Sequence, residues 1–406
     1  MNVASQRSAV VAGVSVVAAG SMTANAAAYL LHLPASRWLG PAGYSEFASL
    51  LAAQLIIAVP ALALQMVIAR EVVTSRLAGR DRTPQLRQLG YANAVLVATI
   101  AVLLVPVTAA VLNTSLVAAA AALLAAPVLV LLATEQGLLQ GQQRFGELAV
   151  VLAGAGVARV APAVVALALG GGPAVALAAA ALGAAVAAAC ANMLVRRGTA
   201  VEGDGLVRDS DMRRLSVMTV LRASHIQLAI VVFTSLDLVI ARVVFEDTVA
   251  GQYALGAVAA KVAFWLPHAV GIVIFPRMAN PALTKSAVRF IVVVLAGLGV
   301  AMVAGAALLA PIVPFLVGED YRPIVGLLWL FAAQGAILAI LQGILLSAIA
   351  RDRTAVSFVV WAGLGVEAVL LLTLPLTITS FLIVAICCAT GTTGVALATV
   401  IASLRR

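Results

Sequence analysis

A few polar side chains lie deep inside long apolar stretches of this sequence, where such groups are costly and usually face a cavity or a partner. Arg159 lies about twelve residues past the start of one stretch, or roughly 18 Å into a helix at 1.5 Å per residue. Lys261 and Gln54 are similarly deep in two other stretches. The charged residues at this depth lean basic, which favours an anionic cargo. We therefore expect these residues to bind an anionic group. The alternatives are a structural ion pair for Arg159 and simple helix packing for the other two.

Two of these polar residues precede a proline by the same distance. Gln54 is six residues before Pro60, and Lys261 is six residues before Pro267. Proline removes a backbone hydrogen bond and favours a kink. We expect both prolines to act as hinges in bent helices that line one cavity.

Arg222 and His225 are three residues apart and would share one face of a helix. We expect them to assist in binding the anionic group. The alternative for Arg222 is that its long side chain reaches the membrane surface.

Two acidic residues, Asp237 and Glu367, lie inside apolar stretches and are candidates for coupling to an ion. Asp237 has a local alternative, which is helix capping or a salt link with Arg242. Glu135 lies near the end of its stretch, and we expect it at the membrane interface.

Enzymatic motifs are absent from the sequence. The only lysines are Lys261 and Lys285, neither in a GxxxxGK[ST] phosphate loop. The three histidines form no HExxH, there is no GxSxG, and the three cysteines form no CxxC. We therefore expect no catalytic residues, no cofactor and no metal.

Composition places the chain in a membrane. Of 406 residues, 64% are hydrophobic and only 10% are charged, which is too few to cover a soluble protein of this size. Apolar runs long enough to cross a bilayer of roughly 30 Å recur along the chain. Helices are required, because an isolated strand would leave its backbone unsatisfied in lipid. We predict an all-α polytopic fold with twelve spans, at residues 8–33, 43–69, 88–112, 115–138, 147–169, 174–194, 217–243, 251–276, 286–309, 323–349, 354–376 and 380–404.

The basic residues support this number of spans. With a cytoplasmic N-terminus, 19 of the 25 arginines and lysines fall in the termini and loops on the cytoplasmic side, and three fall on the opposite side. This bias is typical of cytoplasmic loops. It predicts a multi-pass plasma-membrane protein with both termini in the cytoplasm. Because the basic residues sit at the ends of apolar runs and form no soluble patch, we expect no nucleic-acid binding.

The start of the chain allows two interpretations. Arg7, the apolar stretch 9–19 and the Ala-Asn-Ala sequence at 24–26 resemble a cleavable signal peptide. We favour an uncleaved first span at 8–33, because Arg7 has a counterpart at the start of the second half.

The two halves of the chain resemble each other. Residues that bound or interrupt apolar runs recur at an offset of 207, as in the pairs Arg7 and Arg214, Pro60 and Pro267, Arg70 and Arg277, Arg82 and Arg289, and Arg144 and Arg351. Six spans per half make the repeat parallel. We predict a lobe at 1–195, a cytoplasmic linker at 196–216 and a lobe at 217–406. Such a layout indicates a transporter that holds its cargo between lobes. Within the fourth span, Gly137 and Gly141 form a GxxxG packing signal.

Several short segments resemble a known family. Residues 37–44 (RWLGPAGY) are similar to the first-loop signature of bacterial polysaccharide-biosynthesis flippases, which belong to the multidrug/oligosaccharidyl-lipid/polysaccharide exporter superfamily. Residues 137–145 (GLLQGQQRF) resemble the turn after their fourth span. The second-half counterparts are 250–253 (AGQY), 264–267 (FWLP) and 275–277 (FPR).

The resemblance implies two six-helix lobes around a central cavity and alternating access. It also implies a lipid-linked sugar cargo, typically an undecaprenyl-pyrophosphate oligosaccharide, moved for cell-surface polysaccharide assembly. Its partners would be this glycan, membrane lipids and a polysaccharide polymerase or glycosyltransferases. We keep three alternatives: a cation-coupled drug or small-molecule exporter of the same superfamily, a non-transporting scaffold for glycan assembly, and a membrane-embedded transferase.

Overall fold

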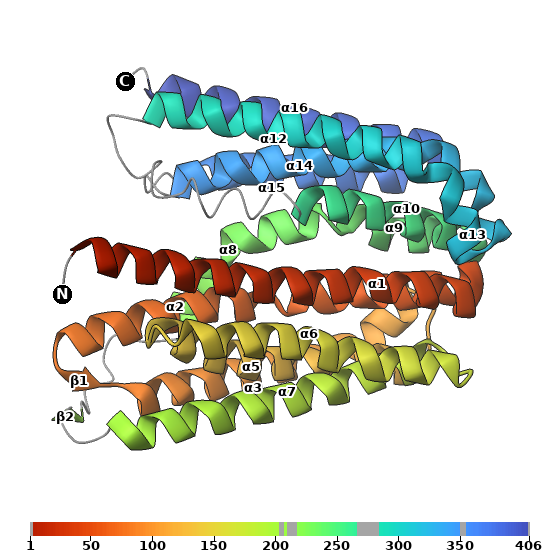
Figure 1. The fold of residues 1–406 in the computed structure, drawn as a ribbon. Coiled ribbons are helices and arrows are strands. Elements are labelled where there is room, and N and C mark those ends of the chain that lie inside the picture. Colours follow the sequence, from red (N-terminus) through yellow and green to blue (C-terminus); the bar gives the residue numbers. More distant parts are fainter. Residues whose placement is uncertain (1–2, 203–206, 209–216, 266–283, 350–354, 405–406) are drawn as a thin grey trace. The chain divides into compact units, whose positions relative to one another are not determined.

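The computed structural model of the chain describes residues 3–202, 207–208, 217–265, 284–349 and 355–404. Nearly all of these residues are helical (Figure 1). The chain divides into two compact units. Unit 1 comprises Met1–Trp38 and Ala53–Gln227, and unit 2 comprises Leu39–Ala52 and Leu228–Arg406. The prediction of an all-α polytopic fold is confirmed, whereas the predicted lobe boundaries stay a prediction.

The elements of the first half alternate long helices with short turns. They are α1 (Val3–Ile57), α2 (Val59–Leu77), β1 (Arg80–Asp81), α3 (Thr83–Val111), α4 (Leu116–Leu123), α5 (Ala125–Gly141), α6 (Phe145–Ala168), α7 (Pro173–Glu202) and β2 (Val207–Arg208). The two short strands pair in parallel, with Arg80 opposite Val207. Part of the predicted linker therefore contacts a loop of unit 1, and its remaining residues after α7 lie outside the described part.

The second half is also helical. Its elements are α8 (Val217–Phe233), α9 (Leu236–Val244), α10 (Asp247–Trp265), α12 (Thr284–Leu309), η2 (Ala310–Ile312), α13 (Val313–Val317), η3 (Glu319–Leu327), α14 (Leu328–Ile349), α15 (Ala355–Thr373) and α16 (Ile378–Leu404).

Within the described part of the chain, nine helical segments are long and apolar enough to cross a membrane. The first, Ser15–Leu77, is 63 residues long and contains two of the predicted spans. The predicted eleventh span corresponds to a shorter apolar helix, Ser357–Thr373. The predicted eighth span begins in α10 and continues into residues outside the described part.

The first two predicted spans are separated at a glycine. Gly40 interrupts α1 with φ 64° and ψ 176°, in the left-handed region that glycine adopts without steric cost. A second helix boundary follows at Ala58, and Pro60 lies in the first turn of α2. Proline is tolerated there because the first turn leaves its backbone N–H groups unused. The helix is therefore interrupted next to Pro60, while the expected bend and hinge role stay predictions.

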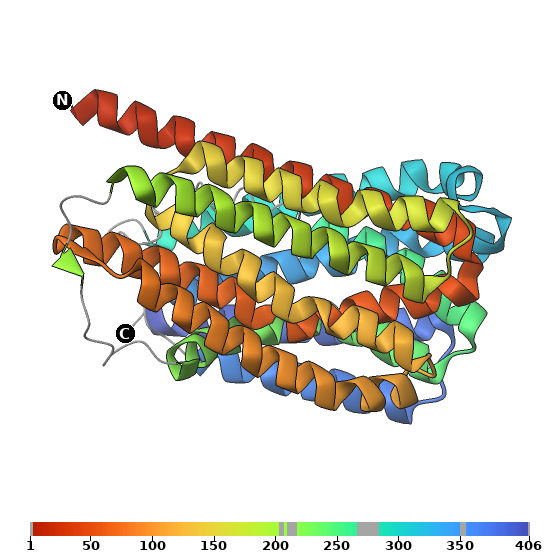
Figure 2. The ribbon, with the colours of Figure 1, turned by 90° about the horizontal axis from the view of Figure 1, so that it is seen from below.

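Small residues allow the helices of unit 1 to approach closely. Helix α5 packs against α2, α3 and α7, and α6 packs against α7 (Figure 2). A Cβ added at Gly137 would lie 2.8 Å from the Gln65 carbonyl oxygen of α2. A Cβ added at Gly141 would lie 2.7 Å from the Ala69 carbonyl oxygen. The packing role expected for this GxxxG pair is confirmed.

Unit 2 is organised around α14, which contacts α10, α12 and α16. An aromatic cluster joins three of these helices. The Tyr253 ring of α10 packs edge-on against Phe331 of α14 at 5.0 Å and against Phe381 of α16 at 5.2 Å. Such pairs add about 0.5–1.5 kcal/mol each beyond their buried area. The cluster fixes α10 next to α14, where the polar groups of this unit lie.

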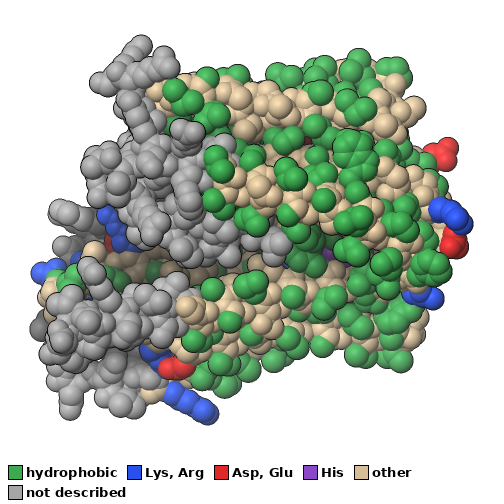
Figure 3. Space-filling model, turned by 45° about the horizontal axis from the view of Figure 1, so that its top comes forward, with side chains coloured by type: hydrophobic (Ala, Val, Ile, Leu, Met, Phe, Trp, Pro, Cys, Tyr) green, Lys and Arg blue, Asp and Glu red, His purple; other side chains and the backbone are tan. Residues whose placement is uncertain are grey.

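The surface agrees with a membrane environment. Large apolar side chains are exposed along the helix flanks, such as Leu103, Leu182 and Phe358 at 67%, 70% and 74%. On the face drawn in Figure 3, hydrophobic side chains cover the helix flanks and the charged side chains gather near helix ends.

Candidate functional site

Arg159 lies at the middle of α6, where two other helices approach that helix closely. A Cβ added at Gly156 would lie 2.5 Å from the Ala24 Cα of α1, and one added at Gly183 of α7 would lie 1.7 Å from the Ala158 carbonyl oxygen. The backbone on both sides of Arg159 is therefore held tightly by α1 and α7.

The residue Arg159 is half-buried as a whole, and no residue in the described part of the chain gives its guanidinium a hydrogen bond or an ion pair. An unpaired cation at this depth is costly. Pro162, three residues after Arg159 and four after Ala158, cannot donate a hydrogen bond to the Ala158 carbonyl, so α6 lacks one backbone hydrogen bond beside Arg159. The site therefore has a positive charge in a closely packed backbone and no counter-ion among the described residues.

The other residues predicted to bind substrate are placed less completely. Gln54 is 5% exposed near the end of α1. His225 is half-buried on α8 and has an interaction of its own. The Arg222 side chain and Pro267 lie outside the described residues.

In unit 2, the carboxylate of Asp237 is the centre of a buried hydrogen-bond network. Between α8 and α9 the helix is broken at Thr234 and Ser235, which places Asp237 in the first turn of α9. Asp237 Oδ2 accepts hydrogen bonds from Tyr253 Oη at 2.8 Å and from Gln334 Nε2 at 2.9 Å. Its Oδ1 accepts one from the Leu238 backbone N–H at 2.8 Å. Asp237 therefore combines a bond to the next residue with contacts to α10 and α14, while the expected capping role or salt link with Arg242 stays a prediction.

Two further charged residues of unit 2 interact with Asp237 electrostatically. One is Lys261 on α10, and the other is Glu367 on α15. Glu367 is 0% exposed, and neither of its carboxyl oxygens has a hydrogen-bond partner among the described residues. Ser235 Oγ and Gln334 Oε1 are also buried without a partner. Buried acceptors are nearly always satisfied, so this group of oxygens requires a physical explanation.

Arg242 is stabilised close to the predicted outer end of its span. Its guanidinium donates to Asp247 and to Ser45. Ser45 belongs to the segment Leu39–Ala52, so this contact ties that segment to the rest of unit 2.

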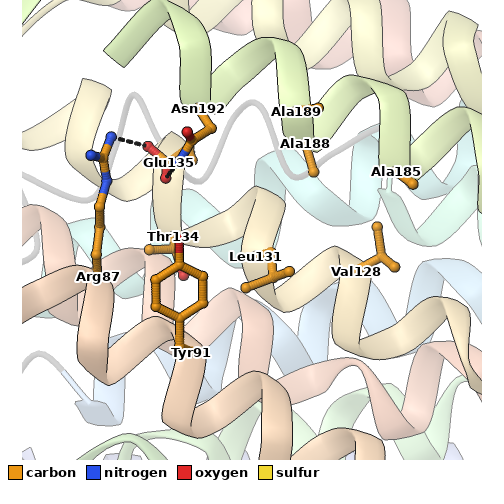
Figure 4. A pocket seen from close by; sticks show the side chains of 10 residues that line it. All are labelled: Arg87, Tyr91, Val128, Leu131, Thr134, Glu135, Ala185, Ala188, Ala189 and Asn192. Carbon is orange, nitrogen blue, oxygen red and sulfur yellow. Dashed lines mark hydrogen bonds and ion pairs between the residues drawn. The ribbon is translucent and has the colours of Figure 1, made fainter. Parts of the chain in front are cut away.

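A second polar network lies in unit 1. Glu135, which we expect at the membrane interface, is only 5% exposed because it is enclosed by neighbouring helices. Its Oε2 accepts from Arg87 Nη2 of α3 at 3.1 Å, and its Oε1 accepts from Asn192 Nδ2 of α7 at 2.7 Å (Figure 4). Arg196 Nε then donates to Asn192 Oδ1 at 2.7 Å.

This network could have been found from the span boundaries. Arg87, Glu135 and Asn192 all lie at the ends of predicted spans on the same side of the membrane. Tertiary packing of α5 between α3 and α7 buries Glu135 there, because two helices bring donors to its carboxylate.

No group of three or more His, Cys, Asp or Glu side chains that could hold a metal ion occurs among the described residues. The membrane-length apolar helices define a polytopic membrane protein, and several of its polar side chains are buried between those helices.

The chain belongs to the family of polysaccharide biosynthesis proteins, whose model matches residues 10–282. This confirms the resemblance seen in the sequence. No curated protein gives a significant match to the sequence.

Solved structures show the same fold at low identity. An inward-facing multidrug resistance MATE family transporter of the MOP superfamily is 14% identical, with 93% of this chain and 95% of that chain covered and a TM-score of 0.70. The MATE transporter VcmN of Vibrio cholerae, in its bent form, is 13% identical, with 98% of both chains covered and a TM-score of 0.59. A MOP superfamily transporter from Pyrococcus furiosus is 15% identical, with 97% and 96% covered and a TM-score of 0.54. The binding pocket of that last transporter has reverse polarity, which suggests a different function for it.

Proposed function

We propose that this protein is a flippase that moves a lipid-linked oligosaccharide, with an anionic pyrophosphate link such as undecaprenyl pyrophosphate, across the bacterial plasma membrane. It would act by alternating access and supply cell-surface polysaccharide assembly, with both termini in the cytoplasm. The family supports a polysaccharide-related cargo. The observation that carries the proposal is the guanidinium of Arg159, which has no partner among the described residues and lies at the middle of a membrane-length helix.

Arg159 suits this cargo for electrostatic reasons. A guanidinium presents a fork of donors that matches phosphate oxygens, and such charge-assisted bonds are strong in a low-dielectric site. Because no carboxylate of the described residues pairs with Arg159, its charge is available to the cargo.

Lys261 has a different role in the proposal, because the negative charge of Asp237 partly offsets its positive charge. When a cation binds to Asp237 and neutralises it, the Lys261 ammonium attracts a phosphate more strongly. We therefore assign Lys261, with Gln54, Arg222 and His225, to a supporting role in cargo binding.

Coupling to a cation is proposed at Asp237 and Glu367. A buried carboxylate without a partner is unstable unless a proton or a metal cation accompanies it. Glu367, Ser235 Oγ and Gln334 Oε1 offer oxygens without partners in the same unit as Asp237. Oxygen atoms of this kind bind hard cations.

The same acidic network favours a second candidate, a cation-coupled small-molecule or drug exporter. The fold and the buried position of Glu367 are compatible with a flippase and with a drug exporter. The two differ in cargo: the first needs the positive charge of Arg159, whereas the second needs the acids and tolerates loss of Arg159.

Reconstitution in liposomes tests the proposal. A fluorescent polyprenyl-pyrophosphate oligosaccharide is placed in both leaflets, and its movement is followed with a membrane-impermeant quencher. We expect the protein to make the inner-leaflet pool accessible and Arg159→Gln to slow this strongly. Arg322→Gln serves as the control, because Arg322 is exposed and pairs only locally with Glu319.

If the lipid does not move but a cationic dye is taken up, the flippase proposal is rejected in favour of the drug exporter. If neither the lipid nor the dye moves, the scaffold alternative is favoured. Chemical conversion of the lipid in detergent would identify a transferase.

A further inference from the structure

An open cavity of about 280 Å³ lies between α3, α5 and α7 in unit 1, and Arg159 is not among the residues that line it. Its walls are mostly apolar side chains, and one end is polar (Figure 4). The lining residues are Arg87, Tyr91, Val128, Leu131, Thr134, Glu135, Ala185, Ala188, Ala189 and Asn192.

The two ends of this cavity differ in chemistry. From Ala185 to Asn192 the α7 wall is seven residues long, or about 10 Å at the helical rise of 1.5 Å per residue. Ala185 and Val128 form the apolar end, whereas Arg87, Glu135 and Asn192 form the polar end. The cavity is therefore a short amphipathic groove, which we call the α3–α5–α7 groove.

The polar end offers donors rather than acceptors. Each Glu135 carboxyl oxygen already accepts a hydrogen bond, from Arg87 and from Asn192. Arg87 Nε is a buried donor without a partner among the described residues. Arg196 Nε donates to Asn192 Oδ1, so a second guanidinium lies next to the polar end of the groove. A group with free acceptor oxygens and negative charge complements this end.

The apolar end opens toward hydrocarbon. Ala185 and Ala189 are exposed, and the neighbouring flanks of α7 and α3 expose large apolar side chains such as Val186 and Val95 at 60% and 66%. A surface of this kind on membrane-length helices is in contact with lipid chains. The small alanines leave a channel there, where larger residues would close it.

We propose that the α3–α5–α7 groove binds one anionic glycerophospholipid of the bilayer, with its phosphate at Arg87 and Arg196 and the first part of an acyl chain along Ala188 and Ala185. The positive-inside bias of the sequence puts the polar end at the cytoplasmic leaflet, where anionic lipids and basic pockets between helices meet. Binding joins α3, α5 and α7 at one end, so it stabilises unit 1. The proposal is independent of the cargo that the protein transports.

Native mass spectrometry of the purified full-length protein, titrated with phosphatidylglycerol or phosphatidylcholine, tests the site. We expect one tightly retained phosphatidylglycerol and at least about tenfold weaker retention of phosphatidylcholine. Ala185→Trp fills the groove and should abolish retention. Val186→Trp is the matched control, because Val186 is the next residue, is exposed and does not line the groove.

Arg87→Gln should weaken phosphatidylglycerol retention about tenfold while leaving that of phosphatidylcholine unchanged. Ala189→Trp, on the exposed part of the same wall, replaces Ala185→Trp if that variant does not fold. Equal retention of both lipids, or unchanged retention in a folded groove-filled variant, would overturn the proposal. So would displacement of phosphatidylglycerol by equimolar undecaprenyl phosphate, since the occupant would then be an isoprenoid.

Discussion

At the scale of single residues, the role of an ionisable group depends more on its neighbours in the fold than on its position in the sequence. Arg159 and Lys261 look alike in the sequence, as two cations at similar depth. In the structure Arg159 has no counter-ion among the described residues, whereas Lys261 lies in the field of Asp237. Of these two cations, Arg159 is therefore the one whose charge is not offset by a carboxylate of the described residues, and in our proposal it binds the cargo.

Glu367 provides a prediction at this scale. Because its carboxyl group is fully buried without a partner, Glu367→Gln should remove the need for a cation and uncouple transport from the ion gradient. Lipid movement in liposomes, measured with and without proton and sodium gradients, should lose its gradient dependence. Glu246→Gln, at an exposed carboxylate of the same unit, should behave like the unmodified protein. A gradient response that persists in Glu367→Gln would remove Glu367 from the coupling site.

At the scale of helices, small residues set the distances that place Arg159. The GxxxG pair of α5 was visible in the sequence and packs as expected against α2. The contact of Gly183 with the Ala158 carbonyl was not visible, because it depends on which helix lies next to α6. For the same reason, the sequence placed Glu135 near a span end without revealing that α3 and α7 would enclose it.

Gly183→Ala tests this helix contact. The added Cβ would lie 1.7 Å from the Ala158 carbonyl oxygen, so α6 and α7 must separate, and overpacking of this kind costs about 1–3 kcal/mol. We expect a lower thermal unfolding temperature in detergent and slower transport, because the backbone around Arg159 shifts. Gly154→Ala in α6 is the control, since a Cβ there meets nothing within 4 Å and alanine favours the helix. Equal stability of the two variants would show that the contact does not hold the helices together.

At the scale of the whole molecule, composition and charge distribution were enough to predict an all-α polytopic protein, and the repeat and short motifs were enough to suggest its family. The break before α9 was not predicted. The helix boundary between Phe233 and Leu236, which sets Asp237 at a helix start, lies in an apolar stretch without glycine or proline. Its position follows from hydrogen bonds to Tyr253 and Gln334, which come from distant parts of the chain.

The membrane orientation gives a prediction for the whole chain. After replacement of the native cysteines, Asp204→Cys in the predicted linker should react with an impermeant maleimide only from the cytoplasmic side, because 19 of 25 basic residues mark that side. Arg322→Cys should react only from the opposite side. Labelling of both cysteines from the same side would contradict the predicted topology.

The central claim is that the charge of Arg159 selects a negatively charged cargo, and a comparison of two lipids tests it most directly. Flipping rates are measured in liposomes for a pyrophosphate-linked and a neutral polyprenyl oligosaccharide with the same sugar, for the unmodified protein and for Arg159→Gln. Hydrogen bonds to charged groups contribute about 1.5–3 kcal/mol, and about 1.4 kcal/mol corresponds to a tenfold change in rate. We expect the unmodified protein to prefer the pyrophosphate lipid at least about tenfold, and Arg159→Gln to lose this preference. Equal rates for both lipids, or a preference that survives in Arg159→Gln, would contradict the account.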